Sequence, residues 1–350
     1  MPIADPMKPF RRLSALRLFH RVLLSVPLCG LLMLGGCRAT LFAGLNSTDQ
    51  HHGIERVRDI TFDPSHRLAL DVYLPERGRP GHSGDRTAAD HAPIVVFFYG
   101  GDWTHGKRQW YRFVGAALAA NGVVVVIPDY RKYPRVTMDG FMRDGARAVA
   151  WAQAHAAELG GDPDNLFLMG HSSGGQIAAL LSTDPTWLKP YGLRPRDLAG
   201  FIGLAGVYDF MPIPASEKDM LGTFGHTLAE QARAQPVRYV SGHEPPMLLL
   251  QGTDDHEVDP ANALSLDKAM LARHEDVTLK LYPGIGHMAL LFALSRPLRG
   301  HAPTLADIVR FIHQHEAMHG GERQAARYRR GTSPRHDRAR PIIDLGPSAG

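Results

Sequence analysis

Five short, continuous runs of apolar residues constrain the fold of this chain more than any other feature. Each run has four or five residues and is rich in Val, Ile, Leu and Phe. They are residues 94–98, 123–127, 166–169, 201–204 and 247–250. Short apolar runs without polar alternation are typical of strands that are buried on both faces of a sheet. The runs therefore predict a mostly parallel sheet at the centre of the protein.

Helical stretches separate these runs, most clearly at residues 139–159, where apolar residues recur about every 3.6 positions. Strands that alternate with helices predict a doubly wound α/β sheet with right-handed crossovers. A last strand at residues 277–282 and a last helix at residues 304–317 complete this sheet. Before the first buried run, residues 57–62 and 68–74 alternate in polarity and predict an N-terminal antiparallel hairpin.

The excess of positive charge lies at the two ends of the chain. The chain has 39 Lys and Arg against 35 Asp and Glu, a net charge of +4. Residues 1–36 and residues 320–350 each carry a net charge of +4, so residues 37–319 carry −4. Binding of nucleic acid needs a basic face on the folded domain, and this distribution argues against it. We expect residues 318–350 to form a basic, disordered tail.

The N-terminus has the pattern of an export signal. A basic segment precedes the apolar residues 22–34, a run too short for a spanning helix of about 20 residues but typical of a signal peptide. Leu34-Gly35-Gly36-Cys37 follows and resembles a bacterial lipobox, in which the cysteine is lipidated. We expect residues 1–36 to be a signal peptide, Cys37 to carry a lipid anchor, and residues 37–55 to be a tether. A plain secretory signal and an uncleaved membrane anchor are the alternatives.

A candidate nucleophile follows the third apolar run. Gly170-His171-Ser172-Ser173-Gly174-Gly175 lies between that run and a helical stretch at residues 176–182. Gly-x-Ser-x-Gly between a strand and a helix is typical of a strained turn that exposes a serine hydroxyl, and it needs glycine on both sides. Ser172 has glycine two positions before and after it, whereas Ser173 does not. We therefore predict Ser172 as the nucleophile, with the Ser173 N–H facing a developing oxyanion.

A candidate acid follows the run at residues 247–250. The chain order typical of this kind of site is serine, then a carboxylate, then histidine. Asp254 and Asp255 both come after the run, but Asp255 has the Gly-x-x-Asp-x-x-Val spacing with Gly252 and Val258. We favour Asp255 as the acid.

A candidate base comes directly after the last predicted strand. His287 lies there on a glycine-flanked loop, and it is the one histidine in this position among the 19 of the chain. His256 is its rival, but beside the acid it is interpreted as a surface loop residue. We predict that His287 takes the proton of Ser172 and gives it to the leaving group, while Asp255 orients the imidazole.

A glycine pair follows the first apolar run, in Tyr99-Gly100-Gly101-Asp102-Trp103. Glycines allow backbone N–H groups to approach a substrate oxygen closely. We predict that Gly100, Gly101 and Ser173 donate hydrogen bonds to the oxyanion. Asp102 would repel that oxyanion if it faced inward, so we expect it to face outward or to bind a substrate hydroxyl.

These motifs together resemble the α/β-hydrolase superfamily, in particular its esterase/lipase branch. That branch contains hormone-sensitive-lipase-like carboxylesterases, acetylxylan and feruloyl esterase-like proteins, kynurenine formamidase and isoprenylcysteine methylesterase. The resemblance implies an α/β-hydrolase domain over residues 56–317. It also implies hydrolysis of carboxylic esters through a serine acyl-enzyme, with no metal and no organic cofactor. Tyr99 replaces the family's usual histidine and is interpreted as structural, as is Asp129-Tyr130-Arg131, a salt-bridged strand end.

Two further segments have structural interpretations beside functional ones. Residues 207–243, which we name the cap insert, are long for a loop and are expected to form a small cap over the substrate pocket. Its apolar residues, together with Trp103 and Trp110, could line that pocket or only pack the cap. His315 and His319 have a helical metal-binding spacing, but a solvated helix face is favoured.

The sequence thus predicts a serine carboxylesterase that acts on a small-molecule ester. We expect it to be anchored in a bacterial cell envelope through Cys37, with a secreted or periplasmic soluble protein as the alternative. Amide or peptide hydrolysis is a second possibility, as in formamidases or prolyl-oligopeptidase-like relatives. A non-catalytic binding protein on a hydrolase scaffold is a third.

Overall fold

The computed structural model describes residues 39–47, 53–76 and 92–329, with side chains described up to residue 316. The chain divides into two units, residues 1–45 and residues 46–350. A helix over residues 39–47 lies within the segment that the sequence predicts as a tether, residues 37–55. Cys37 and the predicted signal peptide lie outside the described residues.

The second unit is built on one sheet of eight strands in the order β1-β2-β4-β3-β5-β6-β7-β8. Strands β3 to β8 are parallel, whereas β2 is antiparallel to both of its neighbours. The strands are β1 (Glu55–Asp63), β2 (Leu68–Leu74), β3 (Ala92–Phe98), β4 (Val124–Pro128), β5 (Gly161–His171), β6 (Gly200–Leu204), β7 (Met247–Gly252) and β8 (Val277–Tyr282). The predicted hairpin and all six later strands are therefore present.

The strands are buried, which explains why their sequences are continuous apolar runs. All residues of β4, β6 and β7 are buried, because helices cover both faces of the sheet there. Strand β8 is different, since it forms the edge of the sheet and leaves most of its side chains partly or fully exposed.

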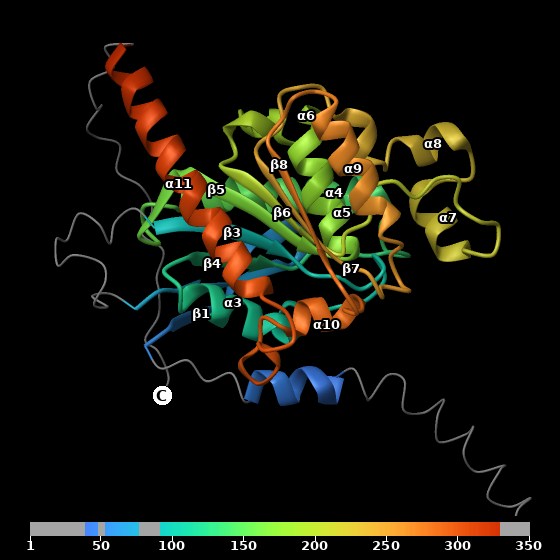
Figure 1. Ribbon diagram of the computed structural model, residues 1–350, viewed down its shortest axis with the longest axis horizontal. Coiled ribbons are helices and arrows are strands. Elements are labelled where there is room, and N and C mark those ends of the chain that lie inside the picture. The colour runs from blue at the N-terminus through green and yellow to red at the C-terminus, as the bar shows by residue number, and fades with distance from the viewer. Residues whose placement is uncertain (1–38, 48–52, 77–91, 330–350) are drawn as a thin grey trace, which may run out of the picture. The chain divides into compact units, whose positions relative to one another are not determined.

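Helices cover the two faces of the sheet (Figure 1). Helices α3 and α11 pack against each other on one face, and α4 and α5 pack together on the other. The α-helices of this unit are α3 (Arg112–Ala119), α4 (Met138–Ala154), α5 (Ser173–Thr183), α6 (Pro185–Leu188), α7 (Lys218–Phe224), α8 (Leu228–Ala232), α9 (Ala261–Leu271), α10 (His287–Phe292) and α11 (Thr304–Arg329). Short 3-10 helices are η1 (Pro64–His66), η3 (Arg108–Tyr111), η4 (Lys189–Tyr191), η5 (Pro195–Asp197), η6 (Pro236–Tyr239) and η7 (Arg296–Leu298). The result is the predicted doubly wound arrangement.

The final helix differs most from its predicted bounds. We expected α11 to end at residue 317, but it continues to Arg329. Residues 318–329, expected within the disordered tail, are therefore helical. The segment from Glu322 to Arg329 consists almost entirely of strong helix formers, Glu, Arg, Gln and Ala, which explains the extension. Helix α4 is shorter than predicted, since it ends at Ala154 and not at residue 159.

The cap insert forms α7, α8 and η6 between β6 and β7. Figure 1 shows α7 and α8 beside each other, outside the sheet. Helix α8 begins with a capping box, in which Thr227 and Glu230 each bind the backbone N–H of the other. An ion pair of 2.9 Å between Arg233 and Asp139 joins the end of the insert to α4.

A buried arginine joins the hairpin to the central strands. Arg108 forms ion pairs with Asp71 of β2, with Asp59 of β1 and with Asp129, which follows β4. Asp71 also pairs with Arg56 at 2.7 Å and is 1% exposed. Since an unpaired buried charge is costly, Asp71 depends on its two arginines, whereas the side chain of Asp59 is 70% exposed.

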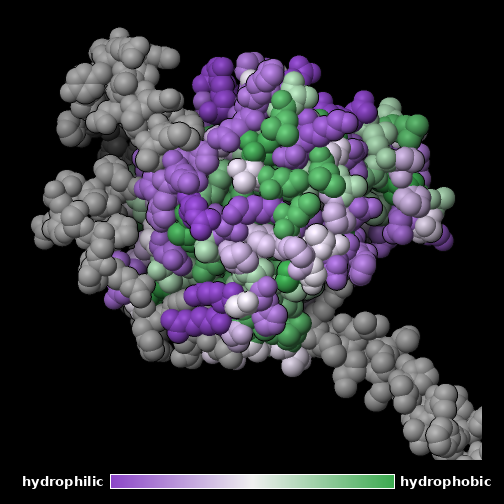
Figure 2. Space-filling view, viewed as in Figure 1, coloured by the Kyte–Doolittle hydropathy of each residue, from purple (hydrophilic) through white to green (hydrophobic). Residues whose placement is uncertain are grey.

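The exposed surface is mixed in character. Hydrophobic side chains gather over α9 and β8 (Figure 2), where Leu264, Leu271 and Leu281 are 47%, 56% and 43% exposed. Among the helices of the described residues, none has the length and apolar character that crossing a bilayer requires.

Candidate active site

The turn from β5 into α5 places Ser172 in a strained backbone conformation. Its φ is 56° and its ψ is −128°, a region that residues with a side chain rarely adopt. A Cβ on Gly170 would clash with the carbonyl of Gly174, and a Cβ on Gly174 would clash with the carbonyl of Phe98. The two glycines of the motif are therefore required by close approach of the backbone on both sides of the serine.

Helix α5 starts directly after this turn and is buried along its whole length. Ser173 is its first residue, so the Ser173 N–H belongs to the first turn, where backbone donors have no partner within the helix. The Ser172 N–H donates to Leu204 O of β6 at 3.0 Å. The predicted nucleophile and the predicted donor thus lie at the N-terminus of a rigid helix.

The structure places Asp255, and not Asp254, against His287. Asp255 Oδ2 lies 2.9 Å from His287 Nδ1, and the two residues are 4% and 5% exposed. Asp254 and His256 are exposed, so neither rival shares this buried position. His287 is the first residue of α10, and it directly follows the glycine-rich loop after β8.

Both oxygens of Asp255 have several donors. The N–H groups of Glu257 and Val258 donate to Oδ1 at 3.0 and 2.8 Å, and Gln251 Nε2 donates to Oδ2 at 3.0 Å. Burial alone would raise the pKa of Asp255, but the hydrogen bonds from His287 and Val258 outweigh it and lower that pKa below its ordinary value. Asp255 is therefore ionised at neutral pH. The contact with Gln251 was not predicted, because a glutamine at a strand end carries no motif.

His171, the residue before Ser172, contacts His287. The imidazole rings of His171 and His287 are 4.7 Å apart, and His171 Nε2 lies 3.5 Å from His287 O. Among the hydrogen bonds of the described residues, none joins Ser172 to His287. Contacts between nucleophile and base are often looser before substrate binds. The sequence did not predict a role for His171, which occupies the variable position of the motif.

The loop after β3 passes directly beside the serine. A Cβ on Gly100 would lie 2.9 Å from Ser172 Cβ, so only glycine permits this approach. Gly101 has a φ of 139°, and its carbonyl accepts from the N–H of His105 at 2.7 Å. Asp102 is exposed, which agrees with the expectation that it faces outward.

Trp103 packs the cap insert onto this loop. Its indole lies 4.8 Å from the ring of Phe224 and 6.0 Å from that of Phe210, both in the insert. Its Nε1 donates to Gln176 Oε1 at 3.1 Å. Of the two interpretations of Trp103, packing of the cap is the one supported by these contacts. Trp110 is half-buried, with Lys107 Nζ 5.9 Å from its ring.

Tyr99 and the segment Asp129-Tyr130-Arg131, which we interpreted as structural, form hydrogen bonds and ion pairs. Tyr99 is fully buried, and its hydroxyl donates to Asp129 at 2.9 Å. Arg131 binds both oxygens of Asp144, at 2.8 and 2.7 Å. Asp129 pairs with Arg108. The salt-bridged strand end expected at Asp129-Tyr130-Arg131 is therefore confirmed.

The expectation of a solvated face at His315 was wrong. His315 is 7% exposed, its Nδ1 lies 2.8 Å from Phe311 O, and its Nε2 lies 3.1 Å from Asp276. Asp276 precedes β8 and is far from α11 in the sequence, so the helix spacing alone could not predict this partner. The side chain of His319 lies outside the described residues.

Asp63, His66 and Asp144 bring donor atoms within 4.8 Å of one another, a spacing that a metal ion could bridge. However, Arg147 pairs with Asp63, and Arg131 pairs with Asp144. Since guanidinium groups already bind both carboxylates, we interpret this group as an ion-pair network that joins the hairpin to α4.

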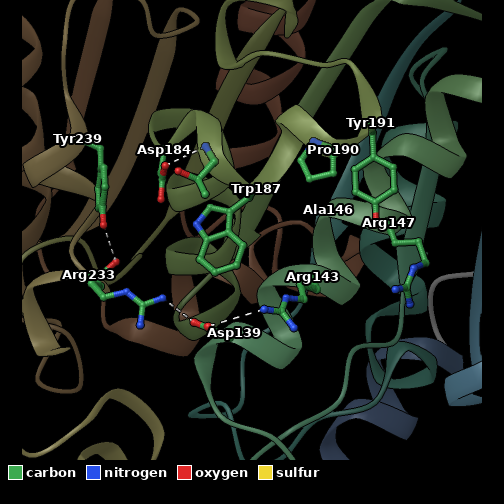
Figure 3. Close-up of a pocket in the computed structure, with 11 residues that line it drawn as sticks. Asp139, Arg143, Ala146, Arg147, Asp184, Trp187, Pro190, Tyr191, Arg233 and Tyr239 are labelled. Atoms are coloured by element: carbon green, nitrogen blue, oxygen red, sulfur yellow. Dashed lines mark hydrogen bonds and ion pairs between the residues drawn. The ribbon is translucent and has the colours of Figure 1, made fainter.

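A pocket of about 560 Å³ lies apart from the predicted catalytic residues, none of which lines it (Figure 3). Trp187 and Tyr191 line it together with side chains of α4 and of the cap insert. Two of its carboxylates already have partners, since Asp139 binds Arg233 and Asp184 accepts from the N–H of Thr186 at 2.9 Å. We therefore separate this pocket from the candidate active site.

The model of the BD-FAE family matches residues 70–270, more than half of the chain. The chain belongs to the BD-FAE family. This match includes the strained serine and Asp255, but it ends before His287. The fold is that of α/β-hydrolases, as the sequence predicted.

Curated relatives of this BD-FAE protein are named as esterases. A probable isoprenylcysteine alpha-carbonyl methylesterase of Arabidopsis thaliana is 26% identical over 279 residues, which are 73% of this chain and 55% of the relative. A probable carboxylic ester hydrolase, LipM, of Mycobacterium tuberculosis is 32% identical over 247 residues, 63% of this chain and 57% of the relative. The chain spans less than two thirds of the length of these relatives.

Solved structures share the fold. Esterase B of Lactobacillus rhamnosis, inhibited by a tributyrin phosphonate, has a TM-score of 0.69 and 19% identity, and the match covers 86% of this chain and 98% of that one. A truncated carbohydrate esterase from gut microbiota has a TM-score of 0.63 and 17% identity, covering 75% and 96%. At this level of identity the likeness concerns the fold alone.

We expect Gly174→Ala to destabilise the protein by about 3 kcal/mol or more, because its methyl group would enter the backbone of β3. Urea unfolding measures this loss. Gly300→Ala is the matched control, since a Cβ there has no atom within 4 Å and should leave stability nearly unchanged. Equal stability of the two variants would contradict the packing argument.

We expect the His171→Asn variant to lose less stability in acid than the native protein does. Burial, and secondly the charge of His287, lower the pKa of His171 well below its ordinary value. Below about pH 6.5 the unfolded chain therefore binds a proton that the folded protein does not, and stability falls with pH. Between about pH 6.5 and pH 5 the native protein should lose up to about 1.4 kcal/mol per pH unit more than the variant. Urea unfolding of both proteins measures the two slopes, which would be equal if His171 were protonated in the folded state.

Proposed function

We propose that this protein hydrolyses carboxylic esters of small molecules, with Ser172 as nucleophile, His287 as general base and acid, and Asp255 as the orienting carboxylate. The observation that carries the proposal is the buried Asp255–His287 pair beside a strained serine at the N-terminus of α5. This combination is costly to fold and is typical of nucleophilic catalysis. The names of the relatives, which share cleavage of an ester bond, support the same reaction.

The hydrogen bond of His287 determines its role in the reaction. In the neutral imidazole, a proton on Nδ1 that is donated to ionised Asp255 leaves Nε2 free to accept the hydrogen of Ser172. Ser172 Oγ then attacks the carbonyl carbon of the ester. Asp255 remains ionised and stabilises the imidazolium that forms.

The backbone around the serine would bind the negative charge of the tetrahedral intermediate. Gly100 lies beside Ser172, and Ser173 is the first residue of α5; their N–H groups, with that of Gly101, would be the donors, and the helix N-terminus adds a favourable dipole. When the intermediate collapses, His287 gives its proton to the leaving alcohol and the acyl group stays on Ser172. Attack by water, with His287 again as the base, releases the acid and regenerates the serine.

We expect Ser172→Ala to lower kcat on short p-nitrophenyl esters by at least about 10⁴-fold, because the covalent route is lost. Asp255→Asn should lower kcat by about 10⁴-fold, since the imidazole would be held in the wrong tautomer. Release of p-nitrophenol measures both. Ser182→Ala is the matched control, a buried serine of the same helix that bonds only Ala178 O. Undiminished turnover in Ser172→Ala would refute the assignment.

We also propose that the protein is anchored to a bacterial envelope membrane by lipid on Cys37. The Leu34-Gly35-Gly36-Cys37 sequence after an apolar run supports this proposal. Several acyl chains on one cysteine would give stable attachment, at about 0.8 kcal/mol per buried CH₂.

We expect Cys37→Ser, expressed as the full chain in a bacterium, to move the protein from the membrane fraction to the soluble fraction. Immunoblotting after fractionation measures this change, and metabolic labelling with a fatty-acid analogue should mark the native protein but not the Cys37 variant. Cys29→Ser is the matched control. Unchanged membrane association in the Cys37 variant would exclude the lipid anchor.

A further inference from the structure

Three buried tyrosines stack behind the loop that carries Gly100 and Gly101. The ring of Tyr99 lies 5.4 Å from that of Tyr111 and 4.8 Å from that of Tyr130, with interplanar angles of 19° and 26°. All three are at most 4% exposed. They come from the end of β3, from η3 and from the residues after β4, so the stack exists only in the folded protein.

Two hydroxyls of this stack bind consecutive carbonyls of the loop. Tyr130 donates to the carbonyl of Tyr99 at 2.7 Å, and Tyr111 donates to the carbonyl of Gly100 at 3.1 Å. Both bonds are buried. The third hydroxyl, that of Tyr99, points elsewhere and donates to Asp129.

These two carbonyls belong to the peptide units that carry the predicted oxyanion donors. In a trans peptide the C=O and the following N–H point in opposite directions. A bond to the Tyr99 carbonyl therefore fixes the direction of the Gly100 N–H, and a bond to the Gly100 carbonyl fixes that of the Gly101 N–H. Both N–H groups are therefore directed away from the tyrosine hydroxyls, and the first of them belongs to Gly100, which lies beside Ser172.

We propose that Tyr111 and Tyr130 are positioning residues that aim the N–H groups of Gly100 and Gly101 at the oxyanion. The proposal rests on the ester hydrolysis proposed above. Each hydroxyl also withdraws charge from the carbonyl that it binds, which makes the N–H of the same peptide a better donor. Neither tyrosine needs to touch the substrate.

The surroundings keep the hydroxyls in place as donors. Complete burial raises the pKa of Tyr130 well above its ordinary value, so its hydroxyl keeps its proton. Lys132 Nζ lies 5.1 Å from the ring of Tyr99 and 4.8 Å from that of Tyr130, and it also bonds the Tyr99 hydroxyl at 2.9 Å. The Tyr99 hydroxyl and Lys132 thus hold the stack, while the other two hydroxyls hold the loop.

The test compares Tyr111→Phe and Tyr130→Phe, each of which removes one hydroxyl and keeps the ring. We expect kcat on a short p-nitrophenyl ester to fall by about 10-fold to 100-fold in each, with KM changed by less than about twofold, because the N–H groups act mainly in the transition state. The rate at which a p-nitrophenyl phosphonate modifies Ser172 should fall in parallel, since its phosphoryl oxygen would occupy the same position.

Tyr282→Phe is the matched control. Its buried hydroxyl donates to Asp307 at 2.7 Å, so its loss should lower stability without changing the oxyanion loop. Unfolding of all variants in urea shows whether they are folded at the assay temperature. The inference is overturned if the folded Tyr111 and Tyr130 variants keep the native kcat, or if Tyr282→Phe loses as much.

The phosphonate also separates this inference from the proposed function. If the native protein cleaves no ester but is modified at Ser172 faster than the two tyrosine variants, ester hydrolysis is refuted and the positioning role is supported. If the native protein cleaves esters and the variants react as fast, only the positioning role is refuted. If Ser172 of the native protein is not modified at all, both are refuted.

Discussion

One backbone turn, at which β5 becomes α5 within the single residue Ser172, determines the arrangement of the rest of the site. Strand β5 is fixed between two buried parallel strands, and α5 is buried along its whole length, so neither can move to relieve the turn. The strain at the serine, with its φ of 56°, is therefore maintained by the packing of the sheet. The turn also requires glycine at positions 170 and 174, because no side chain fits beside it.

The other reacting groups reach this point because the parallel strands all end at the same edge. Gly100 follows β3, Asp255 follows β7 and His287 follows β8. Each is held by bonds that do not involve the serine. Two backbone N–H groups and Gln251 hold Asp255, and the stacked tyrosines hold the glycine loop. Such independent support is what a site needs if its donors are to be in place before charge develops.

Motifs of local origin were predicted well, and partners from distant segments were not. The spacing from Gly252 to Val258 distinguished Asp255 from Asp254, because the backbone N–H groups that bind the carboxylate lie within three residues of it. By contrast, His315 was expected in solvent, but it is buried and its Nε2 lies 3.1 Å from Asp276, which comes before another strand. A periodic pattern describes one helix face and carries no information about which strand or loop will cover that face.

The sequence by itself determined the strands, the mostly parallel character of their sheet, the strained serine and the candidates for acid and base. These follow from short-range properties, namely apolar runs of strand length and glycines that a tight turn requires. Only the tertiary structure decided that His171 lies against His287, that Gln251 supports Asp255, and that two tyrosines bind the glycine loop. Gln251 lies only four residues from Asp255 and was missed because a glutamine at a strand end carries no motif. The contacts of His171 and of the two tyrosines join segments whose distance in space depends on the packing of the whole sheet, and no local pattern in the chain encodes them.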